Sequence, residues 1–562
     1  DAEKGTLRVM VAANRAVETD RIRSAGDGSA VMAEAGLDKS LFETYGAKVV
    51  RAVDNLVTFD VPLAQAMSMG LALAAAGLES RPARLFKAAM GAMASPVGTF
   101  LGAQFLPIPS EGTAAALAAL PKLVEARDLV EGQALERAGM RGQGSLVGII
   151  DSGIDPDHAD FKDAEGNSRI SDYLDFTGEG KDDVVGHGTH VAGTIGGSGA
   201  ASQGAYRGLA DQTKFKVAKV FGTKGETDES VLLAAMKWMA GGGDMGAKVD
   251  LLNMSLGGPG DPNVDPLSSM ANRLTVNDKI LVVAAAGNEG PWTSSVGSPG
   301  NARYALTVGG VNKDGEVAFF SSRGPIVDSQ NRVLYGKPDV MGVSGDVDLS
   351  RVQPAPLVAD SGERPAPHAG LASLAAAPAQ QSCIYAPGVI APRSSHDPDQ
   401  ACVVAGNAGY RYMSGTSMAT PEVAGMAADV IAYLKAQGYE VDPFQVKAVI
   451  METAGTLVKE PKDVQGAGLV NGTRLVQAVV DRVKRGLPVG NVAFALSMRL
   501  TTKDRESLSR QNRYQLTPLG LLDTTSGRLV RDEAEIHSAL QAIRSVPPTQ
   551  TVSLPSVEIL PG

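Results

Sequence analysis

The sequence predicts an α/β protein built on a doubly wound, mostly parallel β-sheet. Five short apolar segments recur after residue 145, each followed by a Gly-rich or polar turn: 146–150, 215–220, 249–254, 280–285 and 305–311. Segments with helical apolar spacing lie between them, at 191–195, 229–239 and 266–277. Strands that are apolar throughout suit a parallel sheet with helices on both faces, so these elements are expected to alternate in one large domain.

A small α+β unit is predicted to precede this domain, in residues 1–133. Its pattern gives a strand at 7–12, a helical stretch within 31–45, a hairpin of 48–53 with 56–61, a helix at 113–120 and a strand at 123–129. With residues 64–112 taken as an insertion, the order of these elements is a split βαβ pattern.

The large domain is expected to span residues 134–486 and to carry an insertion of its own. Residues 346–399 hold eight prolines and many alanines, which predicts a surface excursion. Regular structure should resume at Met413, with helices at 419–433, 444–453 and 475–484. Residues 487–562 form a C-terminal extension whose role the sequence does not indicate and whose clearest strand pattern is 492–501.

The net charge and the hydropathy of the chain argue against a nucleic-acid partner and against a membrane span. With 52 basic and 62 acidic side chains the net charge is −10, so the overall charge does not favour nucleic acid. The longest uncharged run, 88–110, contains three prolines and several glycines, which argues against a membrane span. The two cysteines, Cys383 and Cys402, could close a surface loop as a disulfide or remain free thiols.

Two polar residues stand at the ends of predicted elements. Asp151 comes directly after strand 146–150, where α/β sheets place their sites, and could orient a base; taken alone, an Asp there is more often a turn or helix-cap residue. His187 opens His-Gly-Thr-His-Val-Ala-Gly and is the candidate base. His187 and His190 also have the spacing of a metal pair, but His190 is better explained as a packed helix residue.

Ser417 and Asn288 lie in two further motifs. Ser417 precedes an apolar helix in Ser-Gly-Thr-Ser-Met-Ala-Thr-Pro; a serine there is most often a helix cap, but the helix N-terminus would also stabilise negative charge beside a nucleophile. Because position 419 is Ala, the pattern is not the Gly-x-Ser-x-Gly elbow of α/β-hydrolases. Asn288, in Ala-Gly-Asn-Glu-Gly after a buried strand, could donate to an oxyanion or simply mark a turn.

Together these segments resemble the active-site blocks of the subtilase family. The matching stretches are Asp-Ser-Gly-Ile-Asp at 151–155, His-Gly-Thr-His-Val-Ala-Gly at 187–193 and Gly-Thr-Ser-Met-Ala-Thr-Pro at 415–421. Asn-Met-Ser-Leu-Gly-Gly at 253–258 looks like the family's substrate-binding strand, and the order Asp, His, Ser is that of subtilisin. The resemblance covers residues 134–484 and implies a subtilisin-type fold.

The resemblance implies a serine endopeptidase that works through an acyl-enzyme, without a required cofactor. Ser417 would be the nucleophile, His187 the general base, Asp151 its orienting partner, and Asn288 part of the oxyanion hole. An extended peptide or protein substrate would lie beside Ser255, Leu256, Gly257 and Gly258, with pocket walls at Ala285, Ala286 and Gly287. Broad proteolysis and dedicated processing both fit, and a non-catalytic, peptide-binding scaffold is the alternative.

The N-terminal unit resembles a subtilase propeptide, which implies an intramolecular chaperone and inhibitor. The resemblance places its junction with the large domain near residues 127–133, where the chain would be cut in cis. The family, and the absence of an initial Met from the chain, lead us to expect a secreted or extracytoplasmic protein. Structural calcium is possible, since five carboxylates lie near the motifs (Asp155, Asp157, Asp160, Asp182 and Asp183), but solvated turns are the favoured explanation, because spacing does not show the six to eight converging oxygens that calcium needs.

Overall fold

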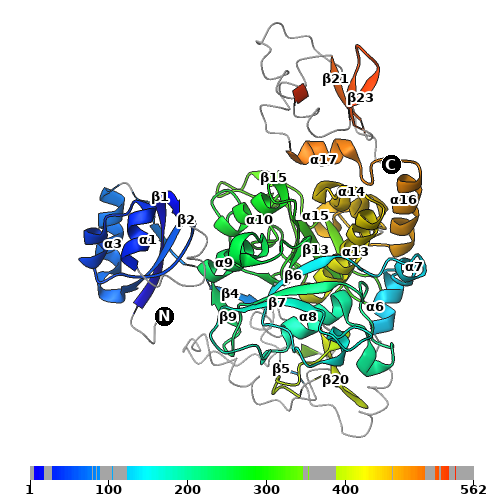
Figure 1. Cartoon of the computed structure of the whole chain (residues 1–562), viewed down its shortest axis with the longest axis horizontal. Helices are drawn as coiled ribbons and strands as arrows, with labels where there is room; N and C mark the ends of the chain where they lie inside the picture. The colour runs from blue at the N-terminus through cyan, green and yellow to red at the C-terminus, as the bar shows by residue number, and fades with distance from the viewer. Residues whose placement is uncertain are drawn as a thin grey trace.

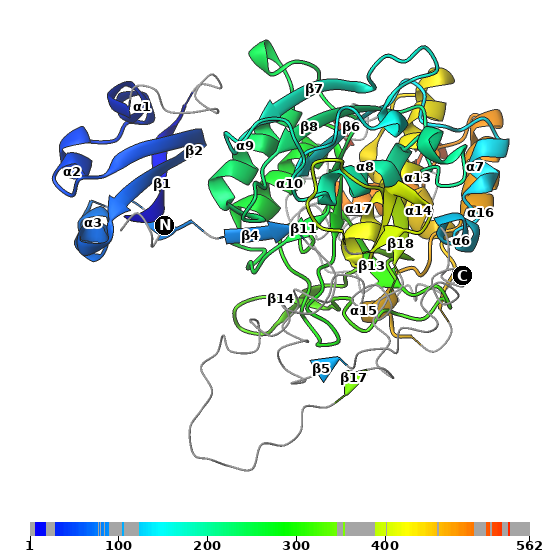
Figure 2. The ribbon, with the colours of Figure 1, turned by 90° about the horizontal axis from the view of Figure 1, so that it is seen from below.

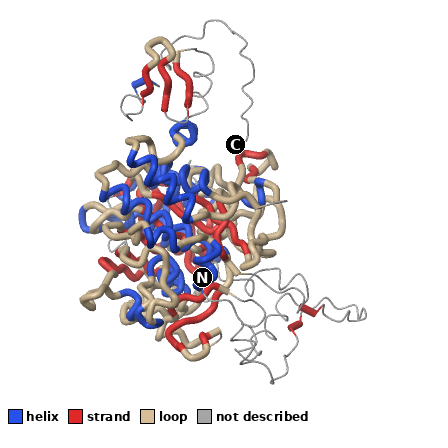
Figure 3. Tube along the Cα trace, turned by 90° about the vertical axis from the view of Figure 1, so that its right-hand side faces the viewer, coloured by secondary structure: helices blue, strands red, loops and turns tan. Residues whose placement is uncertain are grey.

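The protein was analysed as a computed structural model of the whole chain (Figure 1). The residues that the structure describes are 6–17, 28–76, 78, 80–83, 85–88, 104–105, 123–345, 352–353, 388–400, 402–457, 460–499, 513–517, 520–530 and 538–539. They form a large α/β body, an N-terminal unit on one side of it and a small sheet near the C-terminus (Figures 1 and 3).

The body is built on a seven-stranded sheet in the order β16-β13-β12-β10-β6-β8-β7, and every neighbouring pair is parallel. Its strands are β6 (Leu146–Asp151), β7 (Ile170–Asp175), β8 (Lys214–Lys219), β10 (Leu251–Met254), β12 (Leu281–Ala285), β13 (Leu306–Val311) and β16 (Val340–Val343). From β6 the chain passes to the edge strand β7, returns to β8 between these two strands, and then adds β10, β12, β13 and β16 in order on the other side of β6. The doubly wound parallel sheet is thus confirmed.

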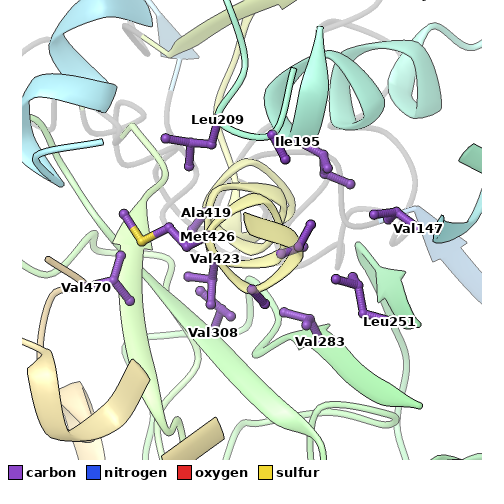
Figure 4. Packing of buried hydrophobic residues seen from close by; sticks show 14 of the residues in the cluster. Val147, Ile195, Leu209, Leu251, Val283, Val308, Ala419, Val423, Met426 and Val470 are labelled. Carbon is purple, nitrogen blue, oxygen red and sulfur yellow. The ribbon is translucent and has the colours of Figure 1, made fainter. Parts of the chain in front are cut away.

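Helices cover both faces of this sheet. One face carries α8 (His187–Gly196) and α13 (Thr416–Ala436), and the other carries α9 (Glu229–Met239) and α10 (Pro266–Val276). Figure 4 looks along α13, whose side chains meet Val147, Leu251, Val283 and Val308 of four neighbouring strands, all fully buried. Each such side chain contributes about 1.5–3 kcal/mol on burial, so α13 is firmly held over the centre of the sheet.

The N-terminal unit has its own core but differs from the predicted pattern. It contains β1 (Thr6–Val17), α1 (Gly28–Ala35), α2 (Lys39–Glu43), β2 (Lys48–Pro62), α3 (Leu63–Ala75) and β3 (Ser80–Pro82). The predicted hairpin of 48–53 with 56–61 is wrong, because β2 is one continuous strand, and its residues 54–62 pair with β1.

The insertion predicted for residues 64–112 also needs correction. Helix α3 begins at Leu63, and its Met69 and Leu73 lie in the core of the unit, while β3 pairs with β1. After β3 the chain reaches the body as β4 (Leu85–Ala88). The predicted helix at 113–120 lies outside the described residues.

Two other predicted strands are helices. Residues predicted as strand 123–129 form α6 (Leu123–Leu129), because Ala126 and Val130, four positions apart, turn one helical face into the body core. Residues predicted as strand 492–501 contain α17 (Val492–Arg499), where Val492 and Ala495 face a small cluster with β22 (Gly520–Asp523). Strands β21 (Tyr514–Thr517) and β23 (Arg528–Val530) flank β22 in the C-terminal sheet.

The insertion at 346–399 is not a surface excursion throughout. Its end forms β18 (Val389–Pro392), which is fully buried and pairs with β20 (Asn407–Met413), so regular structure resumes well before Met413. Val352–Gln353 pairs with Gln104–Phe105; most of the rest of the insertion lies outside the described residues. Cys402 is disulfide-bonded, while Cys383 is outside the described part.

The predicted body helices are present as α14 (Pro443–Thr453) and α16 (Gly472–Lys484), and α7 (Gln133–Arg137) precedes β6. Within the described ranges, no helix has the length and apolar character needed to cross a bilayer.

Candidate active site

Three segments that are far apart in the sequence bring the predicted triad residues to one edge of the sheet. Asp151 is the last residue of β6, His187 is the first residue of α8, and Ser417 is the second residue of α13. All three side chains are fully buried. The carboxyl ends of parallel strands and the N-termini of the following helices meet at this edge, which is where α/β folds place their sites.

The structure brings Asp151 and His187 into direct contact. Nδ1 of His187 lies 2.7 Å from Oδ1 of Asp151, and the same carboxylate oxygen accepts a hydrogen bond from the backbone N–H of Ser152 at 2.7 Å. Among the described residues, none hydrogen-bonds to Nε2 of His187. The imidazole is therefore oriented through one nitrogen, and its other nitrogen is available to a reacting group.

Ser417 is held beside the end of β10. Its hydroxyl donates to the backbone carbonyl of Ser255 at 3.0 Å, and the Ser255 hydroxyl donates back to the carbonyl of Ser417 at 3.0 Å. Nδ2 of Asn253 donates to the Ser255 hydroxyl at 3.0 Å, which fixes its direction. Sequence reasoning missed this mutual pair, and it missed the role of Asn253.

Asn288 follows β12 and reaches the start of α13. Its Oδ1 accepts from both the backbone N–H and the hydroxyl of Thr416, each at 2.9 Å. These two bonds fix the plane of the amide one residue before Ser417. The side-chain NH₂ of Asn288 is consequently held in a constant direction next to the predicted nucleophile.

The segment predicted to bind substrate, residues 255–258, contains a short strand that pairs with another strand of the chain. Leu256–Gly257 forms β11, which pairs antiparallel with β4, and β4 pairs in turn with β9 (Glu226–Asp228). Gly258 exchanges backbone hydrogen bonds with Ser298, at 3.0 and 2.8 Å. The sequence indicated the β11 side of this groove, but it gave no sign of β4 or β9.

The predicted pocket walls, Ala285, Ala286 and Gly287, follow one another at the end of β12. The Ala286 carbonyl accepts from the N–H of Gly297 at 3.2 Å, so the wall meets the Gly258 segment at that glycine. A Cβ at Gly297 would lie 2.7 Å from the Gly258 carbonyl oxygen. Gly297 was not among the predicted pocket residues, although a glycine next to Ser-Pro-Gly is a visible turn signal.

Comparison with known proteins agrees with this geometry. A model described as the subtilase family matches residues 142–352 and 369–473, more than half of the chain. This chain belongs to the subtilase family. The resemblance drawn from the three motifs, and with it the expected subtilisin-like serine peptidase, is confirmed at the level of the family.

Several relatives of this subtilase are proteases by name. Serine protease AprX of Bacillus subtilis (strain 168) is 30% identical over 354 residues, which are 60% of this chain and 67% of AprX. Minor extracellular protease Vpr of the same strain is 26% identical over 443 residues, 61% of this chain and 52% of Vpr. An intracellular serine protease of Paenibacillus polymyxa is 33% identical over 197 residues, 34% of this chain and 56% of that protein. The matches to Vpr and to the Paenibacillus protein thus span about half of each.

His190 of the subtilase is a packed helix residue, as the sequence predicted. Its Nε2 lies 3.0 Å from the carbonyl oxygen of Val389, and burial lowers the pKa of His190 to about 3. It therefore stays uncharged at neutral pH and supports β18 from α8.

Two of the carboxylates considered for calcium take part in internal hydrogen bonds. Asp183 accepts from the N–H and hydroxyl of Thr189, at 2.9 and 2.6 Å, and from the N–H of Gly186 at 2.9 Å. Asp160 accepts from the hydroxyl of Tyr410 and from the N–H of Ala201. Asp183 thereby caps the start of α8 just before His187, a role that sequence reasoning missed.

Asp155, Asp157 and His396 form a small cluster. Each offers one atom that could bind a metal ion, and these three atoms lie within 4.8 Å of one another. Asp155 already accepts from the N–H and hydroxyl of Ser395, both at 2.8 Å. Calcium prefers six to eight oxygen ligands, and this group offers few, one of its members being an imidazole. Asp182 lies 3.6 Å from His396. Structural calcium thus stays an expectation.

Proposed function

We propose that this subtilase is a serine endopeptidase that hydrolyses peptide bonds through an acyl-enzyme on Ser417. The observation that carries the proposal is the 2.7 Å contact between His187 Nδ1 and Asp151 Oδ1, at the edge of the sheet where α13 presents Ser417. Asp151 would hold His187 in the tautomer whose Nε2 accepts a proton.

In the proposed reaction, the Ser417 hydroxyl turns from the Ser255 carbonyl toward His187. Its oxygen attacks the substrate carbonyl carbon while His187 Nε2 takes the proton. Asn288 and the Ser417 N–H would donate to the oxyanion, and the N-terminus of α13 favours that negative charge. His187 then gives the proton to the leaving amine, and a water molecule hydrolyses the ester by the same route.

The substrate would bind as an extended strand along β11, by backbone hydrogen bonding. We propose that the N-terminal unit acts as an inhibitor, because its β4 takes the place of such a strand between β11 and β9. Since β4 pairs with backbone on both sides, a peptide substrate could not pair there at the same time.

We retain secretion as a proposal. The name of Vpr is that of an extracellular protease, whereas the Paenibacillus relative is named as intracellular. Fractionation of the producing cells, followed by detection of the full chain, decides between the two compartments.

A serine-directed fluorophosphonate probe tests the catalytic assignment. The wild-type chain should be labelled and should cleave peptides, whereas Ser417→Ala should lose labelling and several orders of magnitude of activity. Ser168→Ala, at an exposed serine, is the matched control and should behave as wild type. Labelling that persists in Ser417→Ala would show that another residue is the nucleophile, and an unlabelled, inactive wild-type chain would favour a peptide-binding scaffold.

The breadth of cleavage is a separate question. An unfolded, unrelated protein should be digested at many sites by a broadly acting endopeptidase and left largely whole by a dedicated processing enzyme.

A further inference from the structure

Strand β4 shows which residues of the body face a segment that lies in the groove between β11 and β9. It is the central strand of the sheet β11-β4-β9 and is antiparallel to both neighbours (Figure 2). Lys87 stands opposite Gly257 of β11 and Glu226 of β9. Leu85 stands opposite Asp228 of β9. A peptide that took the place of β4 would therefore pass two acidic residues of β9, at alternate positions.

The two walls of this groove differ in charge. Glu226 is exposed, Thr227 is buried and Asp228 is partly buried. Because successive residues of a strand point to opposite faces, Glu226 and Asp228 share one face of β9. The other wall, residues 253–258, contains no charged residue, whereas the segment 222–229 contains one lysine and three acidic residues. The negative charge beside the groove thus comes from the β9 wall.

The N-terminal unit brings basic residues to the β9 wall. Arg8 lies 2.6 Å from the carboxylate of Asp228. Lys87 is the residue that the register places opposite Glu226. Burial lowers the pKa of Arg51, and the negative charge of Asp228 opposes that shift, so a second arginine of the unit lies within the electrostatic range of this carboxylate. Both acidic residues of β9 thus face basic residues of the segment that occupies the groove or of the unit that carries it.

This polarity is not a general property of the contact between the unit and the body. Asp54 of the unit lies 2.5 Å from Arg273 and 3.1 Å from Lys237 of the body. Here the unit supplies the carboxylate and the body supplies the cations. Lys237 lies about two helical turns along α9, away from β9. The pairing of a basic unit with an acidic body is therefore a feature of the groove.

We propose that Glu226 and Asp228 make this enzyme prefer peptides with lysine or arginine at the two positions opposite them. The inference rests on the proposed function and names the substrate class of the same groove. Directly opposite residues of an antiparallel pair have Cβ atoms about 4.5–5.5 Å apart, so opposite charges stabilise the pair and like charges destabilise it. Ion pairs near the surface contribute modestly, so the preference is graded and adds to binding through the backbone.

The register places these two positions relative to the cleaved bond. Along an antiparallel peptide, Gly257, Leu256 and Ser255 face successive residues in the direction of its carboxyl end. The Ser255 carbonyl accepts the hydrogen bond of the Ser417 hydroxyl at 3.0 Å, so the peptide residue opposite Ser255 is expected to offer its carbonyl to Ser417. The residue opposite Glu226 then comes two positions before the attacked carbonyl, and the residue opposite Asp228 comes four positions before it.

Competition between two peptides in one reaction tests the proposal. The two peptides are identical except for Lys or Glu two positions before the attacked carbonyl. The full wild-type chain should cleave the Lys peptide with a kcat/KM about threefold to tenfold above that of the Glu peptide, and this ratio should shrink as the salt concentration rises. Because both peptides compete for the same enzyme, the ratio does not depend on the fraction of molecules whose groove is open.

Substitutions at Glu226 test the assignment of the first position. Glu226→Gln should bring the ratio to within about twofold of one, and Glu226→Lys should reverse the preference. Glu165→Gln, at an exposed residue on the turn before β7, is the matched control and should keep the wild-type ratio. Thermal unfolding of each variant in the Ser417→Ala background shows whether the fold is kept.

A second pair of peptides, with Lys or Glu four positions before the attacked carbonyl, tests Asp228 separately. Asp228→Asn should lower the ratio for this second pair by about twofold or more. Asparagine keeps an oxygen that can accept the Ser230 N–H, which Asp228 binds at 3.0 Å at the start of α9, so the helix cap is retained. Glu226→Gln should leave the ratio for the second pair within about twofold of wild type.

The remaining outcomes separate this inference from the proposed function. An active wild-type enzyme that cleaves the Lys and Glu peptides equally overturns the inference and leaves the peptidase function standing. A ratio that Glu226→Gln does not change in a folded protein also overturns it, as does an enzyme that fluorophosphonate labels but that cleaves neither peptide. Absence of both labelling and cleavage in the wild type would remove the proposed function and this inference together.

Discussion

Glu422 on α13 allows a prediction that can be worked out from one side chain. It lies just over one helical turn after Ser417, the proposed nucleophile, and is 1% exposed. One carboxyl oxygen accepts the backbone N–H of Val343 at 2.8 Å, and no described residue hydrogen-bonds to the other. Burial raises the pKa of Glu422 from its ordinary 4.5 to about 8. The folded protein thus keeps this carboxyl protonated at neutral pH.

The sign of the pH dependence follows from this raised pKa. Between pH 4.5 and about pH 8 the unfolded chain ionises Glu422 and the folded chain does not, so the free energy of unfolding falls as pH rises. The slope is about 1.4 kcal/mol per pH unit, or at most about 3 kcal/mol by pH 7, and the loss is constant above the folded pKa. Glu422→Gln removes this slope but buries an unpaired amide, which costs about 1–3 kcal/mol. The variant should therefore be less stable than its parent near pH 5 and more stable near pH 8.

Urea unfolding from about pH 5 to about pH 8 measures this difference. Both proteins carry Ser417→Ala, which prevents self-digestion, and Glu440→Gln at an exposed position serves as the control. A difference between Glu422→Gln and its parent that does not change with pH would refute the reasoning.

Three other predictions concern single contacts. Asn288→Ala should lower kcat by about 10²–10³ and should also destabilise the fold, because Thr416 loses its hydrogen-bond acceptor. Asn288→Asp keeps that acceptor and should lower kcat with little loss of stability. Steady-state kinetics measures the effect on kcat, and thermal unfolding measures the effect on stability. Asp183→Asn should lower the free energy of unfolding by about 1–3 kcal/mol in urea, through loss of the cap on α8. Asp54→Ala should raise the inhibition constant of the separately prepared N-terminal fragment by about threefold to tenfold, and the effect should shrink as the salt concentration rises. Lys39→Ala, which removes an exposed ion pair within the N-terminal unit, should leave that inhibition constant unchanged.

The central sheet could be predicted because its strands are buried on both faces and therefore read as apolar runs. The exceptions follow the same physics. Edge strand β7 is only partly buried, and its sequence Ile-Ser-Asp-Tyr-Leu-Asp is neither apolar throughout nor strictly alternating, so it carries no clear strand pattern. Strand β16 is four residues long and follows Lys-Pro-Asp, which reads as a turn. The sequence predicts a strand in place of helix α6, because its seven residues are too few to establish a helical period.

The sequence could predict those parts of the candidate site that depend on side chains, and the structure brings Asp151 and His187 into contact. Asp151, His187, Ser417 and Asn288 each stand in a motif whose letters are constrained by close packing around them. In the two hydrogen bonds between Ser417 and Ser255 the acceptors are backbone carbonyls. Every residue has such a carbonyl, so the sequence does not predict these bonds. The same limit applies to Asp183, whose capping partners are mostly backbone groups.

Strand β4 is the clearest case of an element that the sequence does not predict. The reason for this also indicates how the groove would select a peptide. Its pairing with β9 and β11 is made by backbone atoms that every residue carries, so a strand of four residues leaves no recognisable pattern. A groove that binds through backbone hydrogen bonds will accept many sequences, provided the segment can be extended. Selection must then come from charged side chains beside the groove and from how a segment is delivered to it. In this chain the ion pairs Arg8–Asp228 and Asp54–Arg273 fasten the N-terminal unit that carries β4 to the body, so delivery of β4 to the groove would be local.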